Sequence, residues 1–87
     1  MTDEQGRLSS LAIGFRLKTA RDKRGYTMLQ LAERSGLGSS TIDAIEKGKK
    51  TPRADTVERL ARALKVPRCW LAYGDGKKPD WDAAMPS

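Results

Sequence analysis

The chain of 87 residues contains no histidine and only one cysteine, Cys69. Histidine is the commonest general base and the commonest transition-metal ligand, so its absence removes most catalytic and metal-binding arrangements. A single cysteine can form neither an internal disulfide nor a zinc cluster, and no glycine-rich phosphate-binding loop is present. We therefore predict a protein that is not an enzyme, with no catalytic residues, no metal and no cofactor.

Long apolar runs are also missing. No uninterrupted apolar stretch approaches the length of a membrane span. The first ten residues are polar and include Asp3 and Glu4, which does not fit a secretory signal. The lone cysteine suits a reducing compartment. We expect a cytoplasmic protein that makes no contact with membranes.

Positive charge is what the chain has in excess. It holds 17 lysines and arginines against 11 acidic residues, a net charge of +6. Residues 11–74 carry a balance of +8, with 14 basic and 6 acidic residues, whereas the two flanks together carry −2. The folded part is therefore the basic part, which favours an anionic partner such as nucleic acid.

Apolar residues at helical spacing predict five helices, and strand-like alternation is absent. The first helix is capped by Ser9 or Ser10 and runs to about Arg24, before Gly25. Its inward stripe mixes apolar residues with one arginine: Ile13, Leu17, Ala20 and Arg21. Residues 1–9 form a flexible N-terminal arm, and residues 75–87 form a C-terminal tail that is disordered or docks on a partner.

Two short helices follow, separated by a break at residues 36–38. Thr27 caps the first of them, which runs to about Ser35, and Gln30 is its capping-box partner. Gly36 ends it in a left-handed conformation, which glycine adopts at little cost. The next helix starts near Ser39 and stops at Gly48. The spacing matches a helix-turn-helix, with four scaffold positions at its small or apolar sites: Ala32, Leu37, Ile42 and Ile45.

The last two predicted helices complete a domain over residues 10–74. Asp55 caps the fourth helix, whose inward stripe is Val57, Leu60, Ala61 and Leu64. Pro67 lies in the first turn of a short fifth helix, which ends at Gly74.

From Ile13 to Gly74 the chain resembles the DNA-binding domain of phage lambda-type repressors, the Cro/XRE-like family. The matching residues are Arg21, Gly25, Thr27, Leu31-Ala32-Glu33-Arg34, Gly36, Ile42, Ile45-Glu46, Gly48-Lys49, Pro52, Leu60-Ala61, Ala63-Leu64, Val66 and Trp70-Leu71. The resemblance implies an all-α, five-helix fold with a helix-turn-helix formed by helices 2 and 3. It also implies binding to double-stranded operator DNA as a homodimer, with the third helix in the major groove.

Contacts to DNA phosphates are expected from a basic loop that follows the third helix. Residues 47–53 carry four positive charges and no acid, at Lys47, Lys49, Lys50 and Arg53. Such contacts give salt-dependent affinity that does not depend on base sequence. Backbone N–H groups at the start of the second helix, near Thr27 and Met28, add an anion site.

Contacts to DNA bases are expected from the exposed positions of the third helix, which are Ser39, Ser40, Thr41, Asp43 and Ala44. Hydroxyl groups contact several bases, and Thr41 or Ala44 suits a thymine methyl. Related repressors commonly carry long polar residues here, and a glutamine where this chain has Met28. The short side chains therefore favour loose sequence specificity.

Two further groups of residues are interpreted as structural. The resemblance implies a salt bridge between Arg21 and Glu46, both of which point to the core side of their helices, where an unpaired ion is costly. The aromatic and apolar side chains near the C-terminus are candidate dimer contacts: Trp70, Leu71, Tyr73 and Trp81.

These observations favour a transcriptional regulator, most simply a repressor that binds a palindromic operator as a dimer. An alternative keeps the fold but makes protein binding the main role, as in an antitoxin or an accessory protein with weak or autoregulatory DNA binding. The short base-reading side chains and the tail with Trp81 favour this alternative.

Overall fold

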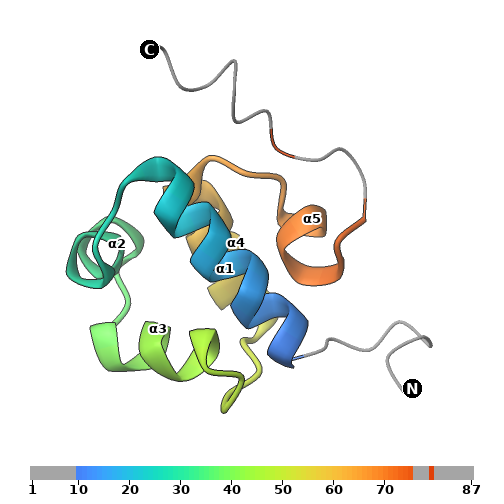
Figure 1. Cartoon of the computed structure of the whole chain (residues 1–87), viewed down its shortest axis with the longest axis horizontal. Helices are drawn as coiled ribbons and strands as arrows, with labels where there is room; N and C mark the ends of the chain where they lie inside the picture. The colour runs from blue at the N-terminus through green and yellow to red at the C-terminus, as the bar shows by residue number, and fades with distance from the viewer. Residues whose placement is uncertain (1–9, 76–78, 80–87) are drawn as a thin grey trace.

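The computed structural model describes residues 10–75 and residue 79, and this part of the chain is all-α (Figure 1). Its five helices are α1 (Ser10–Arg24), α2 (Met28–Ser35), α3 (Ser39–Glu46), α4 (Ala54–Leu64) and α5 (Arg68–Tyr73). The predicted class and helix order are confirmed. The predicted N-terminal arm, and Trp81 in the predicted tail, lie outside the described residues.

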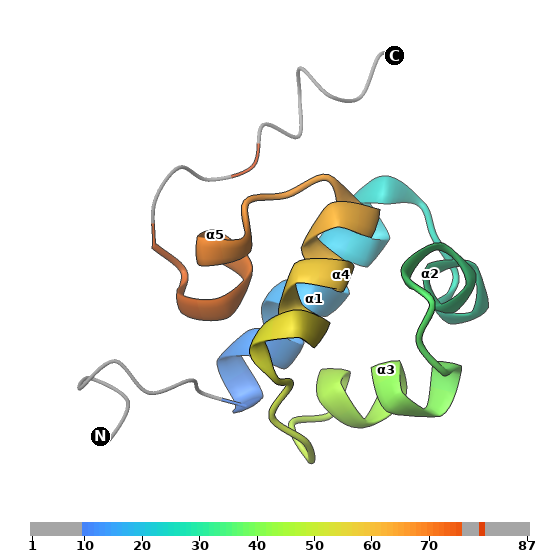
Figure 2. The same ribbon diagram turned by 180° about the vertical axis from the view of Figure 1, so that it is seen from behind.

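The helices enclose one core. Helix α1 packs against α3, α4 and α5, and α2 packs against α3 and α4. Figures 1 and 2 show α1 and α4 in the middle, one in front of the other, with α2 and α3 to one side and α5 to the other. The predicted apolar stripes are buried in this core, and their largest fully buried members are Ile13, Leu17, Leu31, Ile42, Ile45, Leu60 and Leu64.

Three arginines of α1 each reach a different helix. The Arg16 guanidinium donates to the carbonyl oxygens of Leu71 and Ala72, both at 2.9 Å. Arg24 donates in the same way at the end of α4, to the carbonyl oxygens of Leu64 (2.7 Å) and Lys65 (2.9 Å). Because the last carbonyls of a helix lack partners within it, both arginines act as C-terminal caps. Arg21, the third arginine, contacts α3.

Burial has an electrostatic cost for Arg16. Partial desolvation lowers the pKa of its guanidinium below the ordinary value, and the nearby negative charge of Asp75 acts in the opposite direction. The guanidinium groups of Arg16 and Arg24 are therefore engaged by backbone carbonyls of the domain itself. The basic surface available to a partner is smaller than the net charge of residues 11–74 indicates.

The two ends of α2, a capping box at its start and a glycine turn at its end, have the geometry predicted for the helix-turn-helix. The Thr27 side chain accepts from the Gln30 N–H (3.0 Å), and the Gln30 side chain accepts from the Thr27 N–H (2.8 Å). Gly36 has φ 75° and ψ 20°, which is the left-handed conformation. The capping box and the glycine turn predicted from sequence are therefore confirmed.

Loss of the cap should be measurable. Replacing Thr27 with alanine leaves the Gln30 N–H without its side-chain acceptor, so we expect the free energy of unfolding to fall by about 1 kcal/mol. Thermal unfolding followed by circular dichroism measures the effect, which corresponds to roughly 4–8 °C for a domain of this size. Thr27→Ser, which keeps the hydroxyl, is the control. An alanine variant as stable as the serine variant would contradict the role of the cap.

Three predicted helix ends are wrong by one or two residues. Helix α3 ends at Glu46 and not at Gly48, because Lys47 (ψ 0°) and the left-handed Gly48 already turn the chain. Arg53, and not Asp55, is the N-cap of α4, because Arg53 is the residue with extended backbone (φ −79°, ψ 168°). Asp55 lies in the first turn, where its charge complements the helix dipole. Pro67 precedes α5 as its N-cap (ψ 134°) instead of lying in its first turn.

Candidate nucleic-acid interface

Helix α3 forms an edge of the molecule (Figure 1). Its inner face is fixed by Ile42 and Ile45, both fully buried. Of the five predicted base contacts, Ser39 and Ser40 are exposed, and the other three, Thr41, Asp43 and Ala44, are half-buried. The accessible start of the helix therefore presents two hydroxyl groups. Its N-cap is Gly38, which has no side chain to cap the first N–H groups of α3.

Asp43 and Lys47 contact each other. The Lys47 ammonium lies 3.2 Å from the Asp43 carboxylate, one helical turn away. The Lys47 and Asp43 side chains are 57% and 40% exposed, so solvent weakens the pair and it can separate. Asp43 is a predicted base contact and Lys47 is a predicted phosphate contact, so the pair brings the two kinds of predicted contact side by side. The acid that would repel a phosphate is thereby offset by a neighbouring cation.

The basic loop between α3 and α4 is fastened to the start of α1. The Thr51 and Ser10 hydroxyl groups are hydrogen-bonded, and the Lys49 N–H donates to the Ala44 carbonyl at 2.9 Å. Pro52 is buried, and the side chain of Leu11 lies against Gly48. Lys49, Lys50 and Arg53 are exposed. The loop thus holds three exposed cations on an anchored backbone next to α3.

The start of α2 offers less than predicted. The Thr27 N–H is occupied by Gln30 within the capping box, so Thr27 cannot offer that group to a phosphate. Met28 is half-buried and packs against the core, which leaves its N–H and that of Leu29 as the donors of the first turn. The Leu29 side chain, 62% exposed, was missed by the sequence interpretation. Helical spacing was the available signal, because Met28, Leu31 and Ala32 define the inward stripe and Leu29 lies outside it.

Arg21 and Glu46 form the buried link between α1 and α3. Two parallel hydrogen bonds join them, from Nε to Oε2 at 2.6 Å and from Nη2 to Oε1 at 3.0 Å. The side chains are 13% and 5% exposed. Arg21 also donates to the Tyr26 carbonyl at 3.1 Å. Hydrogen bonding to Glu46 raises the pKa of Arg21 despite its partial desolvation, so the guanidinium stays charged.

The close approach of α1 to α3 depends on Gly14, which was missed in the sequence. Gly14 is buried, and a β-carbon built there would lie 2.6 Å from the Glu46 carbonyl oxygen and closer still to that of Ile45. A glycine inside a helical pattern usually marks such a packing site. This signal was present in the sequence.

The candidate dimer contacts separate into two groups. Leu71 is fully buried and Trp70 is 9% exposed, both within the core of their own chain. Leu71 therefore has no surface for a partner, and its assignment as a dimer contact is wrong. Tyr73 is 51% exposed and stays available. Trp81 lies outside the described residues.

The part of the chain that the structure describes contains no cluster of histidine, cysteine or acidic residues suited to a metal ion. None of its helices combines the length and the apolar character that crossing a membrane requires.

The sequence is similar to a known protein family and to named relatives. Residues 17–71 match the family model described as Helix-turn-helix. The Bacillus subtilis protein named HTH-type transcriptional repressor RghR is 39% identical over 66 residues, which cover 75% of this chain and 49% of RghR. The chain spans about half the length of the curated relatives it matches.

Two solved proteins have the same fold. The restriction-modification controller protein C.AhdI from Aeromonas hydrophila has a TM-score of 0.69 and 29% identity, covering 71% of this chain and 94% of that one. SinR from Bacillus subtilis, solved in complex with DNA, has a TM-score of 0.66 and 33% identity, covering 68% and 95%. SinR is also matched in a complex with the protein SinI, at a TM-score of 0.65, covering 68% and 58%. These relatives are regulators by name, which confirms the expectation that this is not an enzyme.

Proposed function

Because this chain belongs to the helix-turn-helix family, we propose that it is a sequence-specific DNA-binding transcriptional regulator, and most simply a repressor. It binds a palindromic operator as a homodimer, with α3 of each copy in the major groove. The exposed hydroxyl groups of Ser39 and Ser40 lie at the end of α3 that meets the bases. Thr41, Asp43 and Ala44 lie along the same helix and take part as the helix inserts.

One observation supports this proposal above the others. The anchored loop of residues 47–53 places the exposed cations Lys49, Lys50 and Arg53 directly after α3. A helix in the major groove brings its flanking loop against the phosphate backbone, so these cations neutralise phosphates while α3 reads bases. The pairing of Asp43 with Lys47 reduces the repulsion between an acid and the DNA.

In-vitro selection of binding sites from random duplex DNA tests the proposal. We expect an enriched palindromic consensus whose half-sites are centred about one helical turn apart. Sedimentation of the protein with and without the selected duplex then gives the number of copies bound. Enrichment of a single half-site would contradict the homodimer, and no enrichment at moderate salt would contradict sequence-specific binding.

The contribution of the loop is tested separately. We expect the double variant Lys49→Ala/Lys50→Ala to bind the selected duplex about tenfold more weakly at moderate salt. The slope of log K against log salt should fall in magnitude by about 2, because each lost phosphate contact removes about 0.9. The matched control is Lys18→Ala/Lys23→Ala, which removes the same charge from the exposed side of α1. Equal losses in both variants would show that net charge alone matters.

A second candidate function is protein binding on the same fold, as in an antitoxin-like or accessory protein. Exposed apolar side chains on α1 support it, since Leu11 is 74% and Phe15 is 72% exposed one helical turn apart. The similarity to SinR in its complex with SinI supports it as well. Random-site selection without a consensus, combined with a stable complex with the product of a neighbouring gene, would favour this candidate over the first.

A further inference from the structure

A basic cavity lies between α2 and α4, outside the candidate DNA interface. It has a volume of about 650 Å³ and is lined by Tyr26, Arg34, Ser35, Arg59, Arg62, Ala63 and Lys65. Four of these seven side chains are cationic and none is acidic. The volume is within the range of small-molecule sites in proteins. The walls belong to α2, to α4 and to the residues Tyr26 and Lys65 that flank these helices, whereas the candidate base contacts belong to α3.

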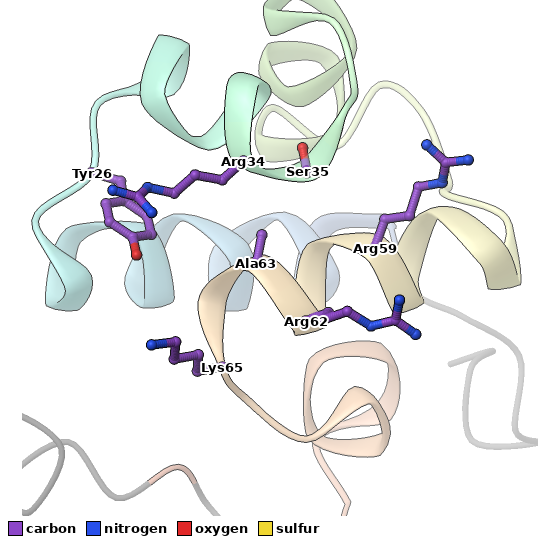
Figure 3. A pocket seen from close by; sticks show the side chains of 7 residues that line it. All are labelled: Tyr26, Arg34, Ser35, Arg59, Arg62, Ala63 and Lys65. Atoms are coloured by element: carbon purple, nitrogen blue, oxygen red, sulfur yellow. The ribbon is translucent and has the colours of Figure 1, made fainter.

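The cations occupy different sides of this cavity. Figure 3 shows Arg34 on α2 beside the Tyr26 ring at one end, Arg59 at the other end, and Arg62 and Lys65 along the α4 side. The Arg34 guanidinium lies 4.6 Å from the centroid of the Tyr26 ring, which is a cation–π contact. The Ser35 hydroxyl is already bonded to the Leu31 carbonyl at 2.7 Å. Guanidinium groups are therefore the main donors that face an occupant.

Helix dipoles explain only part of this arrangement. Basic residues in the last turn of a helix are favourable, which accounts for Arg34 in α2 and Arg62 in α4. Arg59 lies in the middle of α4, where the dipole gives no such advantage. Among the described residues, Arg59 and Lys65 have no ion pair, and Arg62 is paired with the exposed Glu58 at 3.0 Å. The cavity thus retains an excess of positive charge.

Lys65 has an unusual backbone conformation at the end of α4. It is the C-cap of α4 with φ 59° and ψ 47°, and it is the only residue other than glycine with positive φ in the described chain. Glycine or asparagine is favoured in this left-handed conformation, so a lysine here carries a backbone cost. The conformation ends α4, because the Val66 N–H donates to the Ala61 carbonyl oxygen at 3.0 Å. Lys65 is one of the residues that line the cavity.

We propose that this cavity binds a small molecule carrying two or more phosphate groups. Arginine side chains present paired N–H donors that match phosphate oxygens, and several such donors on opposite walls suit more than one phosphate. A concave site of this size encloses a small ligand better than an extended acidic segment. The proposal does not depend on DNA binding by α3.

The site also adjoins the helix-turn-helix. A β-carbon on Gly36, in the turn between α2 and α3, would lie 3.4 Å from Arg59 Nη1. A phosphate held by Arg59 is therefore next to the turn that orients α3. Binding at this site and binding of DNA are separate measurements, so either one can fail alone.

Titration of the 87-residue protein with inorganic tripolyphosphate tests the proposal, with calorimetry for affinity and amide NMR shifts for location. We expect shifts at Arg34, Arg59 and Lys65. The double variant Arg59→Ala/Arg62→Ala should bind about tenfold more weakly, because two charge-assisted contacts are lost. Both residues are exposed, so the variant should fold, as its circular dichroism will verify. Lys18→Ala/Lys23→Ala removes equal charge from the exposed side of α1, outside both the cavity and the loop of residues 47–53, and should change the affinity less than about twofold.

Titrations with further ligands identify the class of molecule that carries the phosphates. ATP binding more tightly than tripolyphosphate, with adenosine failing to bind, would identify a nucleoside polyphosphate. Equal binding of both would identify inorganic polyphosphate. Tighter binding of an oligo-aspartate peptide would overturn the phosphate assignment. Equal loss in the two double variants, or shifts confined to residues 47–53, would overturn the site.

Discussion

Replacing Glu46 with alanine is expected to lower the free energy of unfolding by about 3 kcal/mol, because it leaves the largely buried Arg21 guanidinium without its partner. The pair is joined by two hydrogen bonds and has almost no contact with solvent, so water cannot replace the lost carboxylate. For a domain of this size the loss corresponds to a fall in melting temperature of more than about 10 °C. Thermal and urea unfolding followed by circular dichroism measure it.

The matched control removes a carboxylate from the surface. Glu58 pairs with Arg62 at 3.0 Å and with Arg68 at 3.8 Å, and all three side chains are substantially exposed. Solvent screens these pairs, so we expect Glu58→Ala to cost less than about 1 kcal/mol. The comparison isolates burial, because both variants lose one carboxylate with an arginine partner. Equal effects of the two substitutions would show that the buried pair does not hold α3 to α1.

The sequence specifies the scaffold of this domain better than its surface. Ile42 and Ile45 repeat at helical spacing, and Thr27 with Gln30 forms a recognisable cap, so local patterns predict the helices and their order. Helix ends were less accurate, because the extended residue that caps α4 is Arg53, whose side chain is not typical of a cap. Backbone conformation at one residue decides such a boundary, and composition does not encode it.

Long-range contacts account for the rest of what was missed. Arg16 and Arg24 look like surface charges in the sequence, yet they bond to carbonyl groups that are 55 and 40 residues away in the chain. The Asp43–Lys47 pair follows from i,i+4 spacing, but its consequence for the candidate DNA interface depends on where α3 lies. The cavity between α2 and α4 combines residues from position 26 to position 65, and no single motif links them.

Replacing Gly14 with alanine tests the position of α3 directly. Helix propensity alone predicts a gain of about 1 kcal/mol, because alanine is the best helix former and glycine a poor one. The structure predicts the opposite sign. The new methyl group would meet the carbonyl oxygens of Ile45 and Glu46, which belong to the backbone and cannot rotate away. Overpacking of this kind costs about 1–3 kcal/mol and occasionally more, so we expect a net loss of about 2 kcal/mol.

The same substitution should weaken DNA binding even where the protein stays folded. Helix α3 must move away from α1 to admit the methyl group, and the loop of residues 47–53, anchored to the start of α1, then no longer keeps its place beside α3. Gly25→Ala is the control, because a β-carbon there meets nothing within 4 Å and pays only the left-handed conformational cost of about 1–2 kcal/mol. A Gly14→Ala variant that is more stable than the parent and binds DNA equally well would show that α1 and α3 can separate without consequence. Because the backbones of α1 and α3 are in contact here, a loss of both stability and affinity would identify Gly14 as the residue that sets the distance of α3 from α1.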